Sequence, residues 1–283
     1  MKSNTTMKAL LVFFVMAISG CSSLLYYPTS YMYVDKEKLE YQPKEVNFVG
    51  PENKKIVGWY FRSQAHKPKA VLLFFHGNAQ NISSHFFSLY WILKYGYDFF
   101  IFDYPGYGGS EGEPTPESTV ESGKIALQWL RGLIPADVPL AVFGQSLGGN
   151  IAMRTVVEMK EKISPCMVAI DSSFASYKEA GRRVLKRNIL TWPIQFVSYL
   201  VLDDKYSAYG RIEEISPIPL IVMHGTGDGV VEFVNGEEIF SAAAEPKEFW
   251  RIANGDHTDV FIAKEHAQKY QEKFLESLSK YCR

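Results

Sequence analysis

Residues 141–150, with the sequence AVFGQSLGGN, end an apolar run on a serine that lies between glycines. Gly144 and Gly148 lie two residues on either side of Ser146, which is the G-x-S-x-G spacing of a nucleophile elbow. In such an elbow a strand turns sharply into a helix, and the crowded backbone leaves room only for glycine near the serine. An ordinary turn is the alternative. The spacing favours Ser146 as a nucleophile at the end of a strand.

A serine hydroxyl becomes a good nucleophile when a histidine takes its proton and an acid orients that histidine. In a strand–turn–helix architecture these groups follow one another in the order serine, acid, histidine. Asp228 follows the apolar run LIVMHG, and His257 follows the run EFWRIAN, so both are expected in loops at strand ends. Asp171, after another apolar run, is the alternative acid, but the triad order favours Asp228.

Acyl transfer also needs backbone N–H groups that hold the developing oxyanion. Leu147 directly follows the serine at the start of the expected helix and supplies one such group. The second is expected from the loop after the run VLLFF, where Asn78 is the favoured residue and Ala79 the alternative. His76 in the same loop is expected to brace it rather than to take part in chemistry.

Strands and helices alternate along the chain, which predicts a mostly parallel sheet of about eight strands wound on both sides. Several of the strands are continuously apolar, as expected for strands buried on both faces. The expected strands are residues 45–49, 56–61, 70–75, 98–103, 140–144, 167–170, 220–224 and 248–252. The expected helices are residues 83–95, 117–133, 147–160, 235–244 and 257–279.

Residues 172–216 interrupt this alternation, because they are far longer than an ordinary connection between a strand and its neighbour. They combine large apolar residues with a basic stretch and leave from the carboxyl end of a strand, the edge where ligands bind in open α/β sheets. We therefore expect a small helical cap over the site.

Five motifs in this order, GQSLGG, HGNAQN, FDYPGYGGSEGEPT, HGTGD and GDH, carry a family resemblance. The residues from about Val46 to the C-terminus resemble the serine α/β-hydrolase superfamily, and most of all the branch of BEM46-like proteins and ABHD13- and ABHD17-type hydrolases. The resemblance implies an α/β-hydrolase fold and hydrolysis of carboxylic esters or thioesters, with peptidases nearby. One departure is that Gly229-Val230-Val231-Glu232 lacks the proline that usually follows the acid.

The N-terminus combines two lysines, a short apolar run at residues 9–18 and the small residues Ser19 and Gly20 before Cys21. This order is typical of a secretory signal peptide, here residues 1–20. The ending ISGC resembles a bacterial lipobox, which implies cleavage before Cys21 and lipid attachment to its thiol. Residues 21–43 are then expected to be a tether, and residues 44–283 the catalytic domain. Ser22 and Ser23 resemble the signal for the outer membrane, so the domain is expected to face the periplasm.

The composition excludes several classes of protein. The 283 residues are 47% hydrophobic and 22% charged with a net charge of −1, so no cluster of basic charge points to nucleic acid. No phosphate-binding loop of the G-x-x-x-x-G-K-S/T type occurs, and we expect neither a metal nor a cofactor. Cys166 and Cys282 are expected to be buried free thiols, although an oxidising envelope would allow them to pair.

The sequence thus predicts a lipid-anchored envelope serine hydrolase that cleaves an ester or thioester substrate through an acyl-enzyme. Enzymes of this architecture with an aspartate nucleophile are disfavoured because serine occupies the elbow. An aminopeptidase is an alternative, which acidic cap residues able to bind a free amine would favour. A noncatalytic envelope binding protein is another, which the loss of a triad residue would favour. The oligomeric state stays open.

Overall fold

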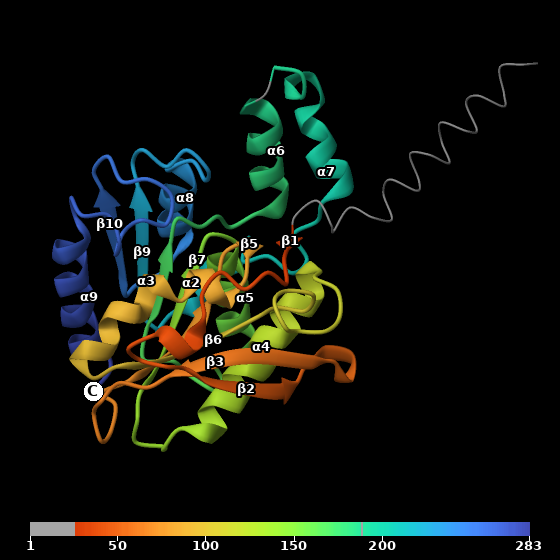
Figure 1. Ribbon diagram of the computed structural model, residues 1–283. Coiled ribbons are helices and arrows are strands. Elements are labelled where there is room, and N and C mark those ends of the chain that lie inside the picture. Colours follow the sequence, from red (N-terminus) through yellow and green to blue (C-terminus); the bar gives the residue numbers. More distant parts are fainter. Residues whose placement is uncertain (1–25, 188) are drawn as a thin grey trace, which may run out of the picture.

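A twisted eight-stranded sheet forms the centre of the molecule, with the strand order β10-β9-β8-β7-β4-β6-β3-β2 (Figure 1). The computed structural model describes residues 26–187 and 189–283. β2 is antiparallel to β3 and β3 to β6, whereas the remaining pairs are parallel. The strands of this sheet are β2 (Lys44–Val49), β3 (Lys55–Phe61), β4 (Val71–Phe75), β6 (Asp98–Phe102), β7 (Leu140–Gln145), β8 (Val168–Asp171), β9 (Leu220–Gly225) and β10 (Lys247–Ile252). The predicted fold class is confirmed.

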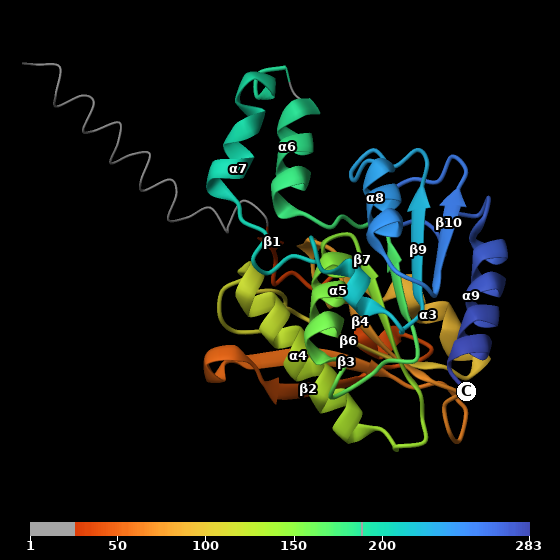
Figure 2. The same ribbon diagram turned by 180° about the vertical axis from the view of Figure 1, so that it is seen from behind.

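Helices cover both faces of the sheet, as Figures 1 and 2 show from opposite sides. The longer ones are α4 (Pro116–Leu133), α5 (Leu147–Met159), α6 (Tyr177–Arg187), α8 (Val234–Ala242) and α9 (Ala267–Tyr281). The short ones are η2 (Lys36–Lys38), η3 (Pro51–Asn53), α2 (Ile82–His85), α3 (Phe87–Tyr90), η4 (Trp91–Tyr95), η5 (Trp192–Val197), α7 (Ser198–Val201) and η6 (Ile212–Ile215). Two further two-residue strands, β1 (Tyr27–Pro28) and β5 (Ala79–Gln80), pair with each other.

The alternation of side chains along β4 explains why the sheet needs cover on both faces. Leu73 and Phe75 belong to the apolar cluster that contains α4 and α5, and Leu72 and Phe74 belong to the cluster that contains α9. All four side chains are fully buried. A continuously apolar run therefore forms a central strand, as predicted.

Two of the predicted helices differ from the observed ones. Residues 83–95 form three short helical pieces instead of one helix. The last helix begins at Ala267 rather than at His257, because the chain after β10 is held in a loop in which Thr258 adopts a positive φ of 54°.

The long connection between β8 and β9 contains the expected cap, although only part of it stands away from the sheet. α6, η5 and α7 form a hairpin that projects from the domain (Figures 1 and 2). η6 returns to the domain, where Ile212 and Ile215 are buried in the apolar cluster beside α5. The projecting hairpin is referred to below as the cap hairpin.

The chain from Tyr26 onward packs against the domain, whereas the sequence predicts a tether over residues 21–43. Tyr26 is buried, and its hydroxyl lies 3.4 Å from that of Thr119 on α4 and 3.5 Å from that of Tyr177 on α6. The expected signal peptide and Cys21 lie outside the described residues. Within the described parts of the chain, no helix has the length and apolar character needed to cross a bilayer.

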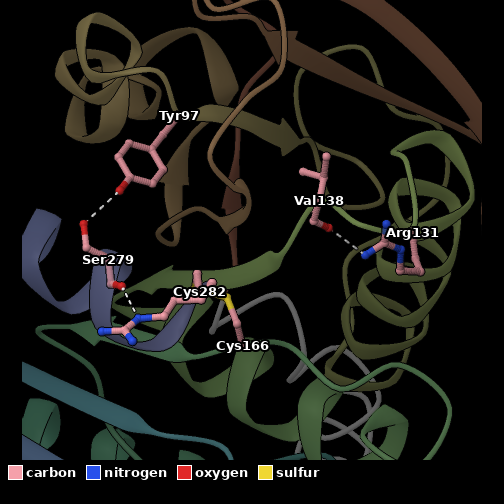
Figure 3. The surroundings of a disulfide bond; sticks show 7 residues. Tyr97, Arg131, Val138, Cys166, Ser279 and Cys282 are labelled. Atoms are coloured by element: carbon pink, nitrogen blue, oxygen red, sulfur yellow. Dashed lines mark hydrogen bonds between the residues drawn. A yellow bond between two sulfur atoms is a disulfide. The ribbon is translucent and has the colours of Figure 1, made fainter.

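Cys166 and Cys282 form a disulfide, so the expectation of free thiols was wrong (Figure 3). The Cα atoms are 5.1 Å apart although 116 residues separate the two positions in sequence. The physical reason is the packing of α9, which places Phe274 and Leu278 in one apolar cluster with Phe143 and Ala169 of the sheet. This packing brings the end of α9 to the start of β8.

Candidate active site

Ser146 lies at a sharp turn between β7 and α5, as the glycine spacing predicts. Its backbone has φ 52° and ψ −122°, a conformation that non-glycine residues rarely adopt. A Cβ on Gly144 would come within 2.7 Å of the carbonyl oxygen of Gly148. A Cβ on Gly148 would come within 2.2 Å of the carbonyl oxygen of Phe75. The two glycines are therefore needed for the close approach of α5 to β7 and β4.

The structure brings Ser146, His257 and Asp228 together at the carboxyl edge of the sheet. His257 Nε2 lies 3.1 Å from Ser146 Oγ, and His257 Nδ1 lies 2.8 Å from Asp228 Oδ2. Ser146 follows β7, Asp228 follows β9 and His257 follows β10. With the proton on Nδ1, the histidine donates to the carboxylate and can accept the serine proton at Nε2.

The carboxylate of Asp228 is fully buried, and its surroundings keep it ionised. Burial alone would raise the pKa of Asp228, but hydrogen bonds from His224 and His257 lower it well below its usual range. Oδ1 also accepts hydrogen bonds from the backbone N–H groups of Val230 and Val231, each at 2.8 Å. These donors fix the carboxylate in the orientation that His257 requires, without the proline that the resemblance leads one to expect.

Asp171, the alternative acid, makes a different set of contacts. Its Oδ2 accepts a hydrogen bond from Gln145 Nε2 at 3.1 Å, and its Oδ1 accepts one from Ser172 Oγ at 3.1 Å. Burial raises the pKa of Asp171 to about 6, against the opposing effect of these hydrogen bonds and of His257. The structure thus places Asp228, and not Asp171, against His257.

The raised pKa of Asp171 predicts a pH-dependent contribution to stability. Between pH 4 and 6 the folded protein binds more protons at this carboxyl than the unfolded chain, so the free energy of unfolding falls as the pH rises. Between pH 5 and 8 we expect the free energy of unfolding to fall less in the Asp171→Asn variant than in the wild type, by roughly 1–2 kcal/mol. Urea unfolding of both proteins at the two pH values measures this difference, and equal falls would contradict the raised pKa.

Of the two expected oxyanion donors, Leu147 directly follows Ser146, and Asn78 lines the same cavity as Ser146. Leu147 is the first residue of α5, where backbone N–H groups have no carbonyl partner within the helix. Asn78 follows β4, and its side-chain Oδ1 accepts hydrogen bonds from the Tyr27 N–H at 3.0 Å and the Tyr107 hydroxyl at 3.1 Å. Ala79 is exposed and pairs with Tyr27 in the short β1–β5 ladder.

His76 braces the loop that carries Asn78, as expected. The ring is fully buried, and its Nδ1 lies 2.8 Å from the carbonyl oxygen of Gly77. Burial lowers the pKa of His76 well below its usual value, so the ring is neutral. The hydroxyl of Tyr104 donates to the His76 carbonyl at 2.9 Å, which ties this loop to the glycine-rich stretch after β6.

A cavity of about 460 Å³ lies between Ser146 and the cap hairpin. Its lining includes Asn78, Ser146 and Leu147 on the domain side. The cap side of the lining combines aliphatic side chains with two arginines: Val184, Leu185, Val201, Leu202, Arg183 and Arg187. A site of this size and composition is suited to an apolar group of a small molecule, held with its reactive atom at the serine.

Comparisons with known proteins agree with this geometry. Residues 66–209, which are 144 of the 283 residues, match the Hydrolase_4 family, described as serine aminopeptidase, S33. The chain belongs to this family. It is an α/β hydrolase.

Relatives of the chain span most of its length. The uncharacterized protein YfhR of Salmonella typhi is 29% identical over 95% of this chain and 93% of its own. The lysophosphatidylserine lipase ABHD12 of Danio rerio is 28% identical over 77% of this chain and 57% of its own. The esterase Pf2001 of Pyrococcus furiosus has the same fold, with a TM-score of 0.73 at 19% identity over 92% of this chain and 99% of its own.

One residue of this hydrolase's site is not predicted from the sequence. His224 lies at the end of β9 with its Nε2 2.9 Å from the Val231 carbonyl oxygen and 3.3 Å from Asp228 Oδ2. The triad order excludes it because it precedes the acid, although its position at the end of the same strand as Asp228 is an available signal. Among the residues that the structure describes, no group of three or more histidine, cysteine or acidic side chains could hold a metal ion.

Proposed function

We propose that this member of the family is a serine hydrolase that cleaves a carboxylic ester or thioester through an acyl-enzyme intermediate. The proposal is carried by the hydrogen-bonded chain Ser146–His257–Asp228, which ends with its serine in the lining of an apolar cavity. A noncatalytic binding protein would have no need of an intact triad at that place.

The reaction proceeds in two steps. Ser146 Oγ attacks the acyl carbonyl carbon while His257 Nε2 takes its proton, and the alcohol or thiol leaves with that proton. Water then attacks the acyl carbonyl carbon while His257 Nε2 takes its proton, and the bond to Ser146 Oγ breaks as that proton returns to Oγ and the carboxylic acid leaves. Asp228 stabilises the imidazolium that forms in each step, and the backbone N–H groups of Leu147 and Asn78 hold the oxyanion. The chain's own residues supply every group that this mechanism requires.

The cavity supports an apolar acyl group as the part of the substrate that is bound. Its cap side presents four aliphatic side chains besides Arg183 and Arg187, so burying an alkyl chain against them removes apolar surface from water. A relative that is a lysophosphatidylserine lipase and an esterase that shares the fold support ester hydrolysis. The similarity to ABHD17B of Homo sapiens, 28% identical over 72% of this chain, supports assignment to the BEM46-like branch.

An aminopeptidase is the second candidate, because Glu232 lines the cavity and a carboxylate there could bind a free amine. Arg187 Nε, however, lies 3.5 Å from Glu232 Oε1 and offsets its charge. Activity assays on p-nitrophenyl esters of increasing chain length, acyl thioesters and aminoacyl amides test the choice. Turnover of esters or thioesters well above that of amides is expected, and preferential release of N-terminal amino acids would replace our proposal with the second candidate.

We also propose that the protein is a lipoprotein anchored through Cys21 at the periplasmic face of the outer membrane. The short apolar run before ISGC supports this location. The disulfide between Cys166 and Cys282 adds support, because disulfides persist in oxidising compartments such as the periplasm.

Replacing the anchoring cysteine tests this location. In the Cys21→Ser variant we expect the protein to leave the membrane fraction after a carbonate wash at high pH, which also removes proteins held only by surface contacts, because acyl chains can no longer be attached. Cell fractionation and incorporation of labelled palmitate measure the change, and N-terminal sequencing establishes that the signal has been cleaved. Ser22→Ala, which keeps the cysteine, is the matched control. A cleaved Cys21→Ser protein that stays in washed membranes would refute the anchor.

A further inference from the structure

The returning arm of the cap hairpin, from residue 189 through η5 to α7, carries a concentration of exposed apolar side chains. Ile189 is 87% exposed, Leu200 76%, Phe196 65%, Trp192 55% and Ile194 53%. These five residues are called the cap tip below. A concentration of large exposed apolar side chains marks a place where a protein binds a partner or a membrane. Figures 1 and 2 show the cap hairpin projecting from the rest of the domain.

We propose that the cap tip docks into the surface of a phospholipid bilayer and that the substrate, a membrane-resident acyl ester, enters the cavity from there. The proposal deepens the ester hydrolase function above and rests on it for the identity of the substrate. The docking itself is a separate property of the cap tip and can be measured without turnover.

The cap hairpin joins the exposed apolar surface to the catalytic serine. Val184 on α6 is 61% exposed and also lines the cavity, so its side chain reaches from the surface into the site. Val201 and Leu202, directly after Leu200, line the same cavity as Ser146. An alkyl chain that leaves a bilayer at the cap tip would therefore stay in contact with apolar side chains on its way to the serine.

The start of the described chain lies at the base of the same hairpin. The hydroxyl of Tyr26 is 3.5 Å from that of Tyr177, the first residue of α6, and Tyr27 lines the cavity. Tyr26 follows Cys21 by five positions, and a chain of that length spans at most about 18 Å when extended. A lipid on Cys21 would hold the base of the cap hairpin within that distance of the bilayer.

The charges of α6 favour a bilayer over a second copy of the chain. Lys186 is exposed in the last turn of the helix, three residues before Ile189 of the cap tip. Basic residues beside an apolar surface are attracted to anionic headgroups. Two copies joined through their cap tips would instead bring their Lys186 side chains toward each other, and like charges across an interface disfavour association.

Trp192 reports on docking directly. We expect vesicles of phosphatidylcholine and phosphatidylglycerol with brominated acyl chains to quench part of the tryptophan emission of the mature lipidated protein. The other tryptophans are shielded from the bilayer: Trp59 and Trp250 are buried, and Trp91 and Trp129 are partly buried against other aromatic rings. The quenched part of the emission should therefore be lost in Trp192→Phe. Vesicle-bound wild-type protein with no quenching specific to Trp192 would overturn the proposal.

A double variant tests whether docking at the bilayer delivers the substrate to the cavity. In Ile194→Asn/Phe196→Asn we expect hydrolysis of an ester embedded in vesicles to fall by at least about tenfold, with hydrolysis of dissolved p-nitrophenyl acetate changed by less than about twofold. Neither residue is part of the cavity lining. Val49→Asn/Leu133→Asn is the matched control, because these side chains are 64% and 54% exposed and lie outside the cap. The control should retain both activities.

Three further outcomes distinguish docking from damage to the site and from dimer formation. Equal losses on the vesicle ester and the dissolved ester would mean damage to the site and would overturn the proposal. A wild-type dimer that the double variant breaks, together with absent quenching, would assign the cap tip to a second copy and would also overturn it. If the wild-type protein hydrolyses no ester at all, the proposed function fails, while quenching of Trp192 still decides the docking.

Discussion

The Ser146→Ala variant is expected to lose hydrolysis by a factor of about 10⁶ and to lose labelling by a fluorophosphonate probe. Alanine removes the Oγ that lies 3.1 Å from His257 Nε2, so no atom is left to attack the acyl carbon or the phosphorus of the probe. The fold should persist, because alanine occupies less space at the elbow and adds no polar group. Turnover of a p-nitrophenyl ester, probe labelling and thermal unfolding measure the three effects.

Ser198→Ala provides the matched control for this experiment. Ser198 also lines the cavity, but its hydroxyl donates to the Gln195 carbonyl oxygen at 3.0 Å and lies on the cap hairpin. We expect this variant to keep probe labelling and most of its turnover. Undiminished labelling of Ser146→Ala would assign the nucleophile to another residue and would end our proposal of a serine triad.

The sheet and its site edge are predictable from sequence because burial on both faces leaves an unbroken apolar signature. The run VLLFF predicts β4 almost to the residue, since Val71 to Phe75 are all fully buried. In a parallel sheet the carboxyl ends of the strands share one edge, so residues that follow β7, β9 and β10 must lie near each other. The elbow spacing and the triad order then select Ser146, Asp228 and His257 among the residues at that edge.

The features that the sequence does not predict depend on contacts between distant segments. Cys166 and Cys282 approach each other only because α9 packs on the sheet, and no local pattern encodes that distance. Tyr26 belongs to a tyrosine-rich segment without helical or strand periodicity, which is typical of a tether. Its burial comes from contacts with α4 and α6, which lie 93 and 151 residues away in sequence.

The start of α9 is also not predicted from the sequence. The last helix is expected to begin at His257, but His257 is held by Asp228 and Ser146, which follow two other strands. A loop is required to present the imidazole, and Thr258 at φ 54° forms part of it. Tertiary contacts at the site thus decide where the loop ends and the last helix can begin.

The Asp228→Asn variant is expected to lower kcat by about 10² to 10⁴ with little change in KM. Asparagine would keep an oxygen for the Val230 and Val231 N–H groups, but its NH₂ would then face His257 Nδ1, which lies 2.8 Å from Asp228 Oδ2. The imidazole would have to place its proton on Nε2, where it could no longer accept the proton of Ser146. KM should stay close to the wild-type value because Asp228 is not part of the cavity lining.

Asp171→Asn is the matched control, since it makes the same change of one oxygen to NH₂ in a second buried aspartate at the same edge of the sheet. Its hydroxyl donor Ser172 can still bond the retained oxygen, and the Gln145 amide can turn to accept from the new NH₂ group. We expect kcat within about tenfold of wild type, because no hydrogen bond joins Asp171 to His257 in the described structure. Thermal unfolding of both variants near the wild-type temperature would exclude a folding defect. A larger loss of kcat for Asp171→Asn than for Asp228→Asn would move the acid to β8 and refute the triad as we assign it.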